Sequence, residues 1–145
     1  MLAKFYYFVI LVTIFYTGSA QDCTLGIGEK NAETMITVFQ LNETQIATME
    51  TLQGKLEIET KIIEEQIEKL LAEHPQSKEQ DLIVMGDKYK ALQHKLLQAS
   101  YESDKTLLAT FNTKQYNRYL ELCNAAIRRP IRITPKVYKD SIAPK

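Results

Sequence analysis

Apolar residues recur at intervals of three and four positions in two long stretches of the chain, which are separated by one histidine–proline step. The first stretch, over about residues 29–73, carries Met35, Phe39, Ile46, Met49, Leu56, Ile63, Ile67 and Leu70. The second carries Leu82, Met85, Tyr89, Leu92, Leu96 and Ala99, then changes phase and resumes as Tyr101, Leu108, Phe111, Tyr119, Leu122 and Ala126. This spacing predicts two long amphipathic helices, the first with a heptad-like, coiled-coil character.

The chain is expected to reverse direction between these helices, at His74–Pro75. The residue before a proline avoids helical backbone angles, so the first helix should end there. Ser77 and Gln80 then have the spacing of a capping box, which would start the second helix. We therefore predict an all-α fold, either an antiparallel helical hairpin or a small helical bundle.

The two cysteines lie at similar distances on either side of this reversal. Cys23 stands 52 residues before Pro75 and Cys123 stands 48 residues after it. A hairpin folded at Pro75 would bring both sulfurs to the same end, and in an oxidising compartment they are expected to pair. Closing a loop of about 100 residues contributes up to about 4.7 kcal/mol in the chain-entropy description. The alternative is two free or intermolecular thiols.

Two arrangements of the hairpin remain open. Uninterrupted helices would be about 66 and 75 Å long, and such a rod has little interior, so it would gain from dimerising into a four-helix bundle. Breaks near Gly54 and near Ser100–Ser103 would instead fold the rod over into a compact bundle within one chain. In that case Ser103 would cap a third helix.

The first twenty residues are expected to be a secretory signal peptide. Lys4 precedes an apolar run over 5–16, and Gly18-Ser19-Ala20 resembles the small residues of a cleavage site. The run is shorter than the roughly 20 residues that span a membrane. The expected organisation is a signal peptide (1–20), an irregular leader (21–28), a helical domain (29–127) and a basic extended tail (128–145), secreted to the extracellular space.

Charge is balanced over the whole chain, with 18 basic and 18 acidic residues. This balance argues against a nucleic-acid-binding protein. The distribution is uneven, because residues 29–73 carry a net charge of −6 and residues 128–145 a net charge of +5. The tail is therefore expected to be drawn toward the acidic first helix or toward an anionic surface.

Candidate chemistry is sparse. Asn42-Glu43-Thr44 is an N-glycosylation sequon, although Asn42 falls on the apolar stripe, where a glycan cannot be buried. The second stretch is rich in aromatic residues, and Tyr101, Phe111 and Tyr119 are candidates to face an apolar ligand. The two histidines would be too far apart to share a metal, and no nucleophile, metal cluster or phosphate-binding loop is recognisable, so no cofactor and no enzymatic activity are expected.

The function indicated by these features is that of a secreted, non-enzymatic helical protein that binds an extracellular partner or forms a homodimer. The general design is similar to that of small secreted proteins of saliva, venom or seminal fluid. One alternative is a carrier of a small hydrophobic ligand within the helical bundle. A second is the precursor of a C-terminal peptide, released at the dibasic pair Arg128–Arg129.

Overall fold

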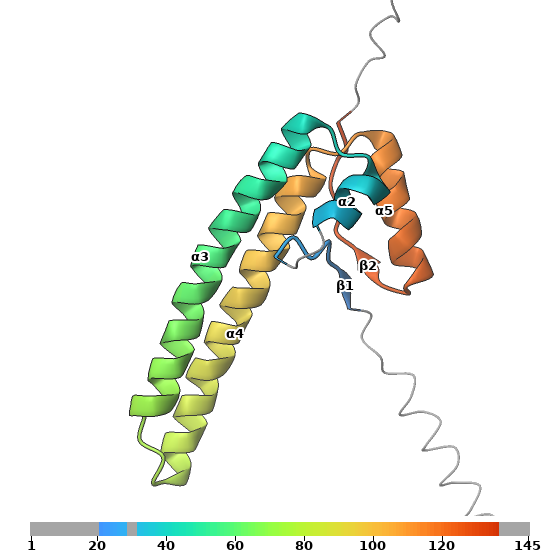
Figure 1. Cartoon of the computed structure of the whole chain (residues 1–145). Coiled ribbons are helices and arrows are strands. Elements are labelled where there is room, and N and C mark those ends of the chain that lie inside the picture. Colours follow the sequence, from blue (N-terminus) through green and yellow to red (C-terminus); the bar gives the residue numbers. More distant parts are fainter. Residues whose placement is uncertain (1–20, 29–31, 137–145) are drawn as a thin grey trace, which may run out of the picture.

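The protein is described by a computed structural model over residues 21–28 and 32–136, and the predicted signal peptide lies outside these residues. Four helices and two short strands follow one another: β1 (Asp22–Cys23), α2 (Ala32–Phe39), α3 (Glu43–Glu73), α4 (Glu79–Leu108), α5 (Thr113–Ala125) and β2 (Arg129–Pro130). Helices α3 and α4 form an antiparallel hairpin (Figure 1). The prediction of an all-α helical hairpin or bundle is confirmed.

The chain reverses where the sequence predicted, at His74–Pro75. The backbone N–H of His74 donates the last hydrogen bond of α3 to the carbonyl of Leu70, and His74 itself has extended backbone angles. The predicted capping box at Ser77 is wrong, because the N-cap of α4 is Lys78 and its side chain makes no capping hydrogen bond. The Lys78 carbonyl already accepts the first helical hydrogen bonds, so Ser77 lies one residue too early to cap.

Both predicted helix breaks are displaced. Gly54 lies inside the continuous α3, and Ser100–Ser103 lie inside the continuous α4. A glycine in a helix interior costs only about 1 kcal/mol relative to alanine, which does not end a helix of 31 residues. The helical segments are instead interrupted at residues 40–42 and 109–112, which are equally distant from the hairpin turn.

Each break is followed by a capping box that starts the next helix. Asn42 Oδ1 accepts from the backbone N–H of Gln45, whose side chain accepts from the N–H of Asn42. Asn112 and Gln115 repeat the arrangement at the start of α5. Two of the free backbone donors at each helix start are thereby satisfied. These boxes turn the chain at both ends of the hairpin.

The two boxes also bind each other inside the protein. The buried amides of Gln45 and Gln115 exchange hydrogen bonds of 2.9 Å. Gln45 Nε2 further donates to the carbonyl of Thr110, and Gln115 Nε2 to that of Phe39. A buried amide network of this kind is stable only when its members are paired. It fixes the two corners of the fold against one another.

The fold combines features of the two predicted arrangements, the long helical hairpin and the compact bundle within one chain. Helices α2 and α5 lie beside one end of the hairpin, and in this view β1 and β2 lie below α2, between the hairpin and α5 (Figure 1). We call this end the head, and it contains the main hydrophobic cluster: Cys23, Ile27, Met35, Phe39, Leu41, Met49, Leu107, Leu108, Phe111, Tyr116, Tyr119, Cys123 and Ile131. We call residues 52–106 the arm, whose outer part is a bare pair of helices.

Candidate functional site

The head is closed by the predicted disulfide. Cys23 and Cys123 are bonded, with an S–S distance of 2.04 Å. Beside them β1 pairs in parallel with β2, and Arg129 forms an ion pair of 3.3 Å with Asp22. The basic tail thus begins as an ordered strand against the leader and α5. Residues 137–145 of the tail lie outside the described residues, so its attraction to the acidic α3 or to an anionic surface stays a prediction.

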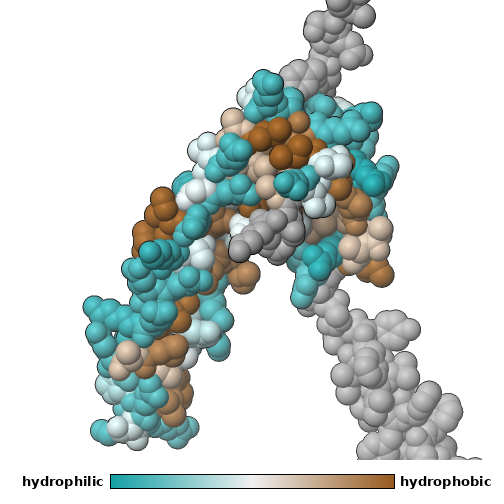
Figure 2. Space-filling model, viewed as in Figure 1, coloured by the Kyte–Doolittle hydropathy of each residue, from teal (hydrophilic) through white to brown (hydrophobic). Residues whose placement is uncertain are grey.

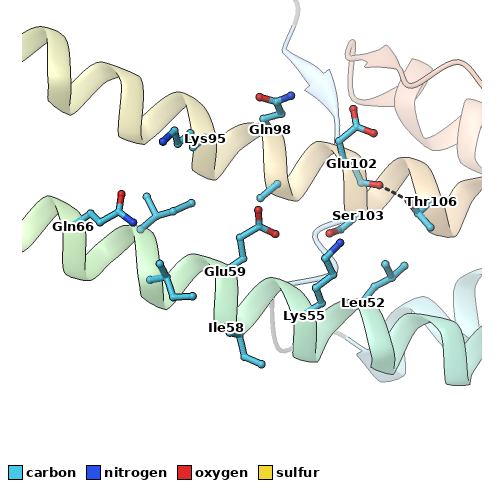
Figure 3. Close-up of a pocket in the computed structure, with 13 residues that line it drawn as sticks. Leu52, Lys55, Ile58, Glu59, Gln66, Lys95, Gln98, Glu102, Ser103 and Thr106 are labelled. Atoms are coloured by element: carbon cyan, nitrogen blue, oxygen red, sulfur yellow. Dashed lines mark hydrogen bonds between the residues drawn. The ribbon is translucent and has the colours of Figure 1, made fainter.

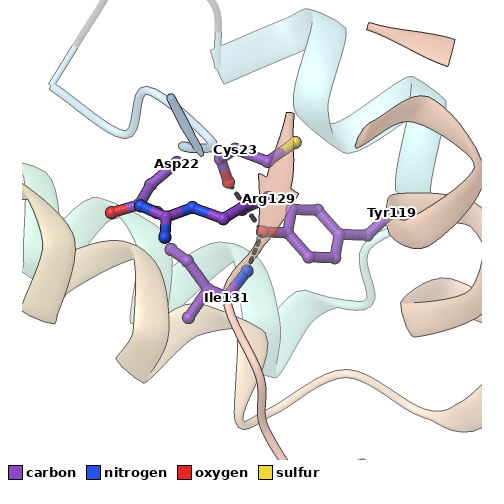
Figure 4. Close-up of polar contacts among 5 residues, drawn as sticks. All are labelled: Asp22, Cys23, Tyr119, Arg129 and Ile131. Carbon is purple, nitrogen blue, oxygen red and sulfur yellow. Dashed lines mark hydrogen bonds and ion pairs between the residues drawn. The ribbon is translucent and has the colours of Figure 1, made fainter. Parts of the chain in front are cut away.

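Tyr119 joins the leader to this strand (Figure 4). Its hydroxyl donates to the carbonyl of Cys23 at 2.6 Å and accepts from the N–H of Ile131 at 2.8 Å. Burial is the main cause that raises the pKa of Tyr119 to about 12. The neighbouring Tyr116 stacks on it and hydrogen-bonds the carbonyl of Ile131. These hydroxyls therefore hold backbone in place.

The residues predicted to face a ligand lie in or against the core of the head. Phe111 and Tyr119 are buried, and Tyr101 packs against the same cluster. None of the three lines the two surface hollows that lie between α3 and α4 on the arm. Their aromatic rings fill the interior because the corners at residues 40–42 and 109–112 fold α2 and α5 over them.

A carboxylate that the sequence analysis did not single out anchors the leader. Asp104 is buried and accepts from the backbone N–H groups of Leu25 at 2.7 Å, Gly26 at 3.4 Å and Ile27 at 3.3 Å. Gly26 has φ 72°, a left-handed conformation that glycine adopts without strain. The available signal was an aspartate within the second apolar stretch and a glycine pair in the leader.

Asn42 is exposed as the N-cap of α3, and Gln45 takes the buried position instead. The conflict between a glycan and the apolar stripe therefore disappears. The cap uses Asn42 Oδ1 as an acceptor, whereas an N-linked glycan is attached to the amide nitrogen. The cap and the glycan are compatible at one residue, and glycosylation stays a prediction.

A long groove runs along one side of the arm, between α3 and α4. It consists of two hollows of about 600 and 580 Å³ that meet at Gln66, one reaching Thr106 near the head and the other reaching Pro75 at the turn. Figure 3 looks into the first hollow. Ile63 and Ala99 are buried at its floor.

Charged side chains of both signs line the hollow nearer the head. Lys55 and Glu59 reach from α3 toward α4, and Glu102 lies on the α4 rim (Figure 3). Lys95 lines the same rim nearer the turn. Within the described residues, no ion pair joins α3 to α4. These charges therefore face solvent or an external partner.

The turn end of the arm carries exposed apolar side chains. Leu82, Ile83 and Val84 are consecutive and are 46, 51 and 37% exposed, and Leu71 on α3 is 45% exposed. We call these four residues the tip cluster. Figure 2 shows hydrophobic side chains among polar ones down to this end. The prediction that Leu82 belongs to the buried stripe is wrong, because no third helix covers this end of the hairpin in the described structure.

Other kinds of site find little support among the described residues. No three His, Cys, Asp or Glu side chains there are close enough to hold a metal ion. No helix in the same residues has the length and apolar character needed to cross a membrane. A scan of protein families finds no matching family model, and searches of curated proteins and of solved structures find no match.

Proposed function

We propose that this protein is a secreted, non-enzymatic interaction protein that binds an extracellular protein through the tip cluster of its arm. The disulfide suits an oxidising extracellular compartment. The head supplies a rigid base, because its disulfide, buried amide network and tyrosine hydroxyls tie its segments together. The arm then holds the tip cluster away from the head (Figure 1).

The observation that carries this proposal is the exposure of three consecutive apolar residues. In a helix, successive side chains point about 100° apart, so Leu82, Ile83 and Val84 face three directions around α4. A single neighbouring helix covers one of these directions. Exposed apolar runs of this length are unfavourable in a solvated helix and mark interaction surfaces.

The two alternative functions have weaker support. A carrier within the bundle would need an internal cavity near Phe111 and Tyr119, where these side chains fill the core. A peptide precursor would need cleavage after Arg129, but Pro130 pairs with Cys23 and Ile131 is buried. An ordered, buried cleavage site is a poor protease substrate.

Capture experiments with matched variants test the proposed function. The wild-type protein, Ile83→Lys and the control Leu97→Lys would be immobilised and exposed to extracellular fluid from the tissue that produces the protein. Leu97 is 70% exposed but lies outside the tip cluster and the groove. We expect a partner that Ile83→Lys loses and Leu97→Lys retains. Equal capture by all three proteins, or capture of nothing, would refute the proposal.

Secretion is tested separately. Expression of the full chain in eukaryotic cells should release protein into the medium, and N-terminal sequencing should read from Gln21. Retention of the chain in the cytosol would contradict the extracellular assignment.

A further inference from the structure

We propose that the groove of the arm docks against the same groove of a second copy of this chain, with both heads at the same end. Helix α3 of each copy then lies over α4 of the other, and the two arms form a four-helix bundle. This inference goes beyond the proposed function, because it concerns a different surface and a different partner.

The groove face has the size that a weak symmetric interface needs. It extends along α3 from Leu52 to Glu73, which corresponds to about 31 Å at 1.5 Å per residue. Two helices packed side by side are roughly 20 Å wide. Two such faces together bury roughly 1,200 Å², the lower end of the range for specific protein complexes.

The antiparallel packing of α3 and α4 places charges of opposite sign side by side along the arm, one on each helix. Gln45 of α3 hydrogen-bonds the carbonyl of Thr110 near the end of α4. Nearer the turn, Lys55 of α3 reaches toward Ser103 of α4, the neighbour of Glu102 in sequence (Figure 3). Glu59 of α3 points toward α4 near Gln98, and Lys95 lies farther along α4 toward the turn (Figure 3).

The positions of these charges along the arm favour one orientation of the second copy. With the heads together, Lys55 lies over the partner's Glu102, and Glu59 lies over the partner's Gln98. With the arms reversed, α3 would lie over α3, and Lys55 would meet the partner's Lys69–Glu73 pair, which has no net charge, in place of the attractive Glu102. Lys69 itself pairs with Glu73 on its own helix at 4.0 Å, so in the heads-together arrangement the partner's Lys88 meets a pair of no net charge.

The leader does not obstruct this docking. The leader is attached to α4 through Asp104 and to α3 through Gln53, whose amide donates to the carbonyl of Ile27. Neither side chain lines the groove. On α4, Asp104 is rotated by about 160° from Glu102, one of the groove-lining residues. The leader and the groove therefore occupy different sides of the hairpin.

A mixing experiment with two charge reversals tests the proposal. Lys55→Glu places two acidic residues over one another in each half of a homodimer, and Glu102→Lys places two basic residues there. Each reversal turns two attractive pairs into two repulsive ones, so each variant alone should dimerise roughly tenfold more weakly than the wild type. An equimolar mixture restores both attractive pairs and should regain the wild-type affinity.

Sedimentation velocity would measure these affinities on the disulfide-bonded chain from Gln21, with circular dichroism confirming that each variant is folded. Lys61→Glu is the matched control, because Lys61 is exposed and lies outside the groove, and it should dimerise like the wild type. A wild-type chain that stays monomeric at its highest soluble concentration overturns the proposal. So does a wild-type dimer that neither reversal weakens, or a mixture that stays as weak as its components.

Discussion

Replacing Tyr119 by phenylalanine tests whether one hydroxyl holds the two ends of the domain together. The substitution keeps the ring, which is only 2% exposed, and keeps its packing against Tyr116. It removes the partner of the Cys23 carbonyl and of the Ile131 N–H, at 2.6 and 2.8 Å. A buried backbone group left unpaired costs about 1–3 kcal/mol. We therefore expect a loss of about 2–4 kcal/mol in the free energy of unfolding.

Urea unfolding followed by circular dichroism at neutral pH, with the disulfide intact, would measure this loss. Tyr101→Phe is the matched control, because Tyr101 is half-buried against the same cluster and its hydroxyl makes no hydrogen bond within the described structure. The control should change stability by less than about 0.5 kcal/mol. A Tyr119→Phe loss no larger than that of the control would refute the bridging role of the hydroxyl.

The hydroxyl of Tyr119 should also make the free energy of unfolding decrease as the pH rises above neutrality. Burial raises the pKa of Tyr119 to about 12 in the folded protein, from 10.0. Between these values the unfolded chain releases the phenol proton while the folded chain keeps it, so stability falls as pH rises. From pH 9 to pH 11 the wild type should lose about 1.3 kcal/mol through this residue. Tyr119→Phe should lack this additional loss of stability. If the stability of both proteins fell equally with pH, the raised pKa of Tyr119 would be contradicted.

Three other substitutions test separate parts of the fold. Asp104→Asn should lower the free energy of unfolding by about 2–3 kcal/mol in urea titration, because a charged acceptor of leader N–H groups is lost; an unchanged midpoint would exclude this anchoring role. Gly54→Ala should stabilise the protein by about 1 kcal/mol in thermal melting, since a Cβ there meets no atom within 4 Å, and a lower melting temperature would contradict the open environment. Thr44→Ala removes the sequon but leaves the Asn42 cap, so protein secreted from eukaryotic cells should lose the glycan mass with little change in stability; a mass difference equal to that of the substitution alone would show that Asn42 is unoccupied.

The main features of the hairpin could be predicted from local sequence rules. Proline excludes helical angles from His74, which fixed the reversal, and the reversal in turn paired Cys23 with Cys123. The symmetry of the chain about Pro75 was also informative, because the real breaks lie at equal distances from the turn. Their positions were missed because Gly54 was taken as the weak point, although asparagine and glutamine three residues apart give the same capping signal as serine and glutamine.

The polar interior could not be predicted from local rules. Gln45 and Gln115 are buried only because two helix starts 70 residues apart in sequence meet and satisfy each other's amides. Asp104 is buried only because the leader folds onto it. Periodicity places a polar side chain on a helix face, but its partner depends on how distant segments pack. For the same reason, the stripe that includes Leu82 did not reveal that the outer arm has no third layer.

The groove and the tip cluster are two consequences of that missing layer, and docking of two arms would couple them. With the heads together, the two tip clusters also lie together, so a partner with two binding sites would be held bivalently. Bivalent binding strengthens capture without a new contact at either tip. Lys55→Glu would then weaken capture of such a partner from a site in the other half of the arm. Ile83→Lys would abolish capture while leaving the sedimenting mass of the free protein unchanged, so the two variants separate the docking of arms from recognition at the tip.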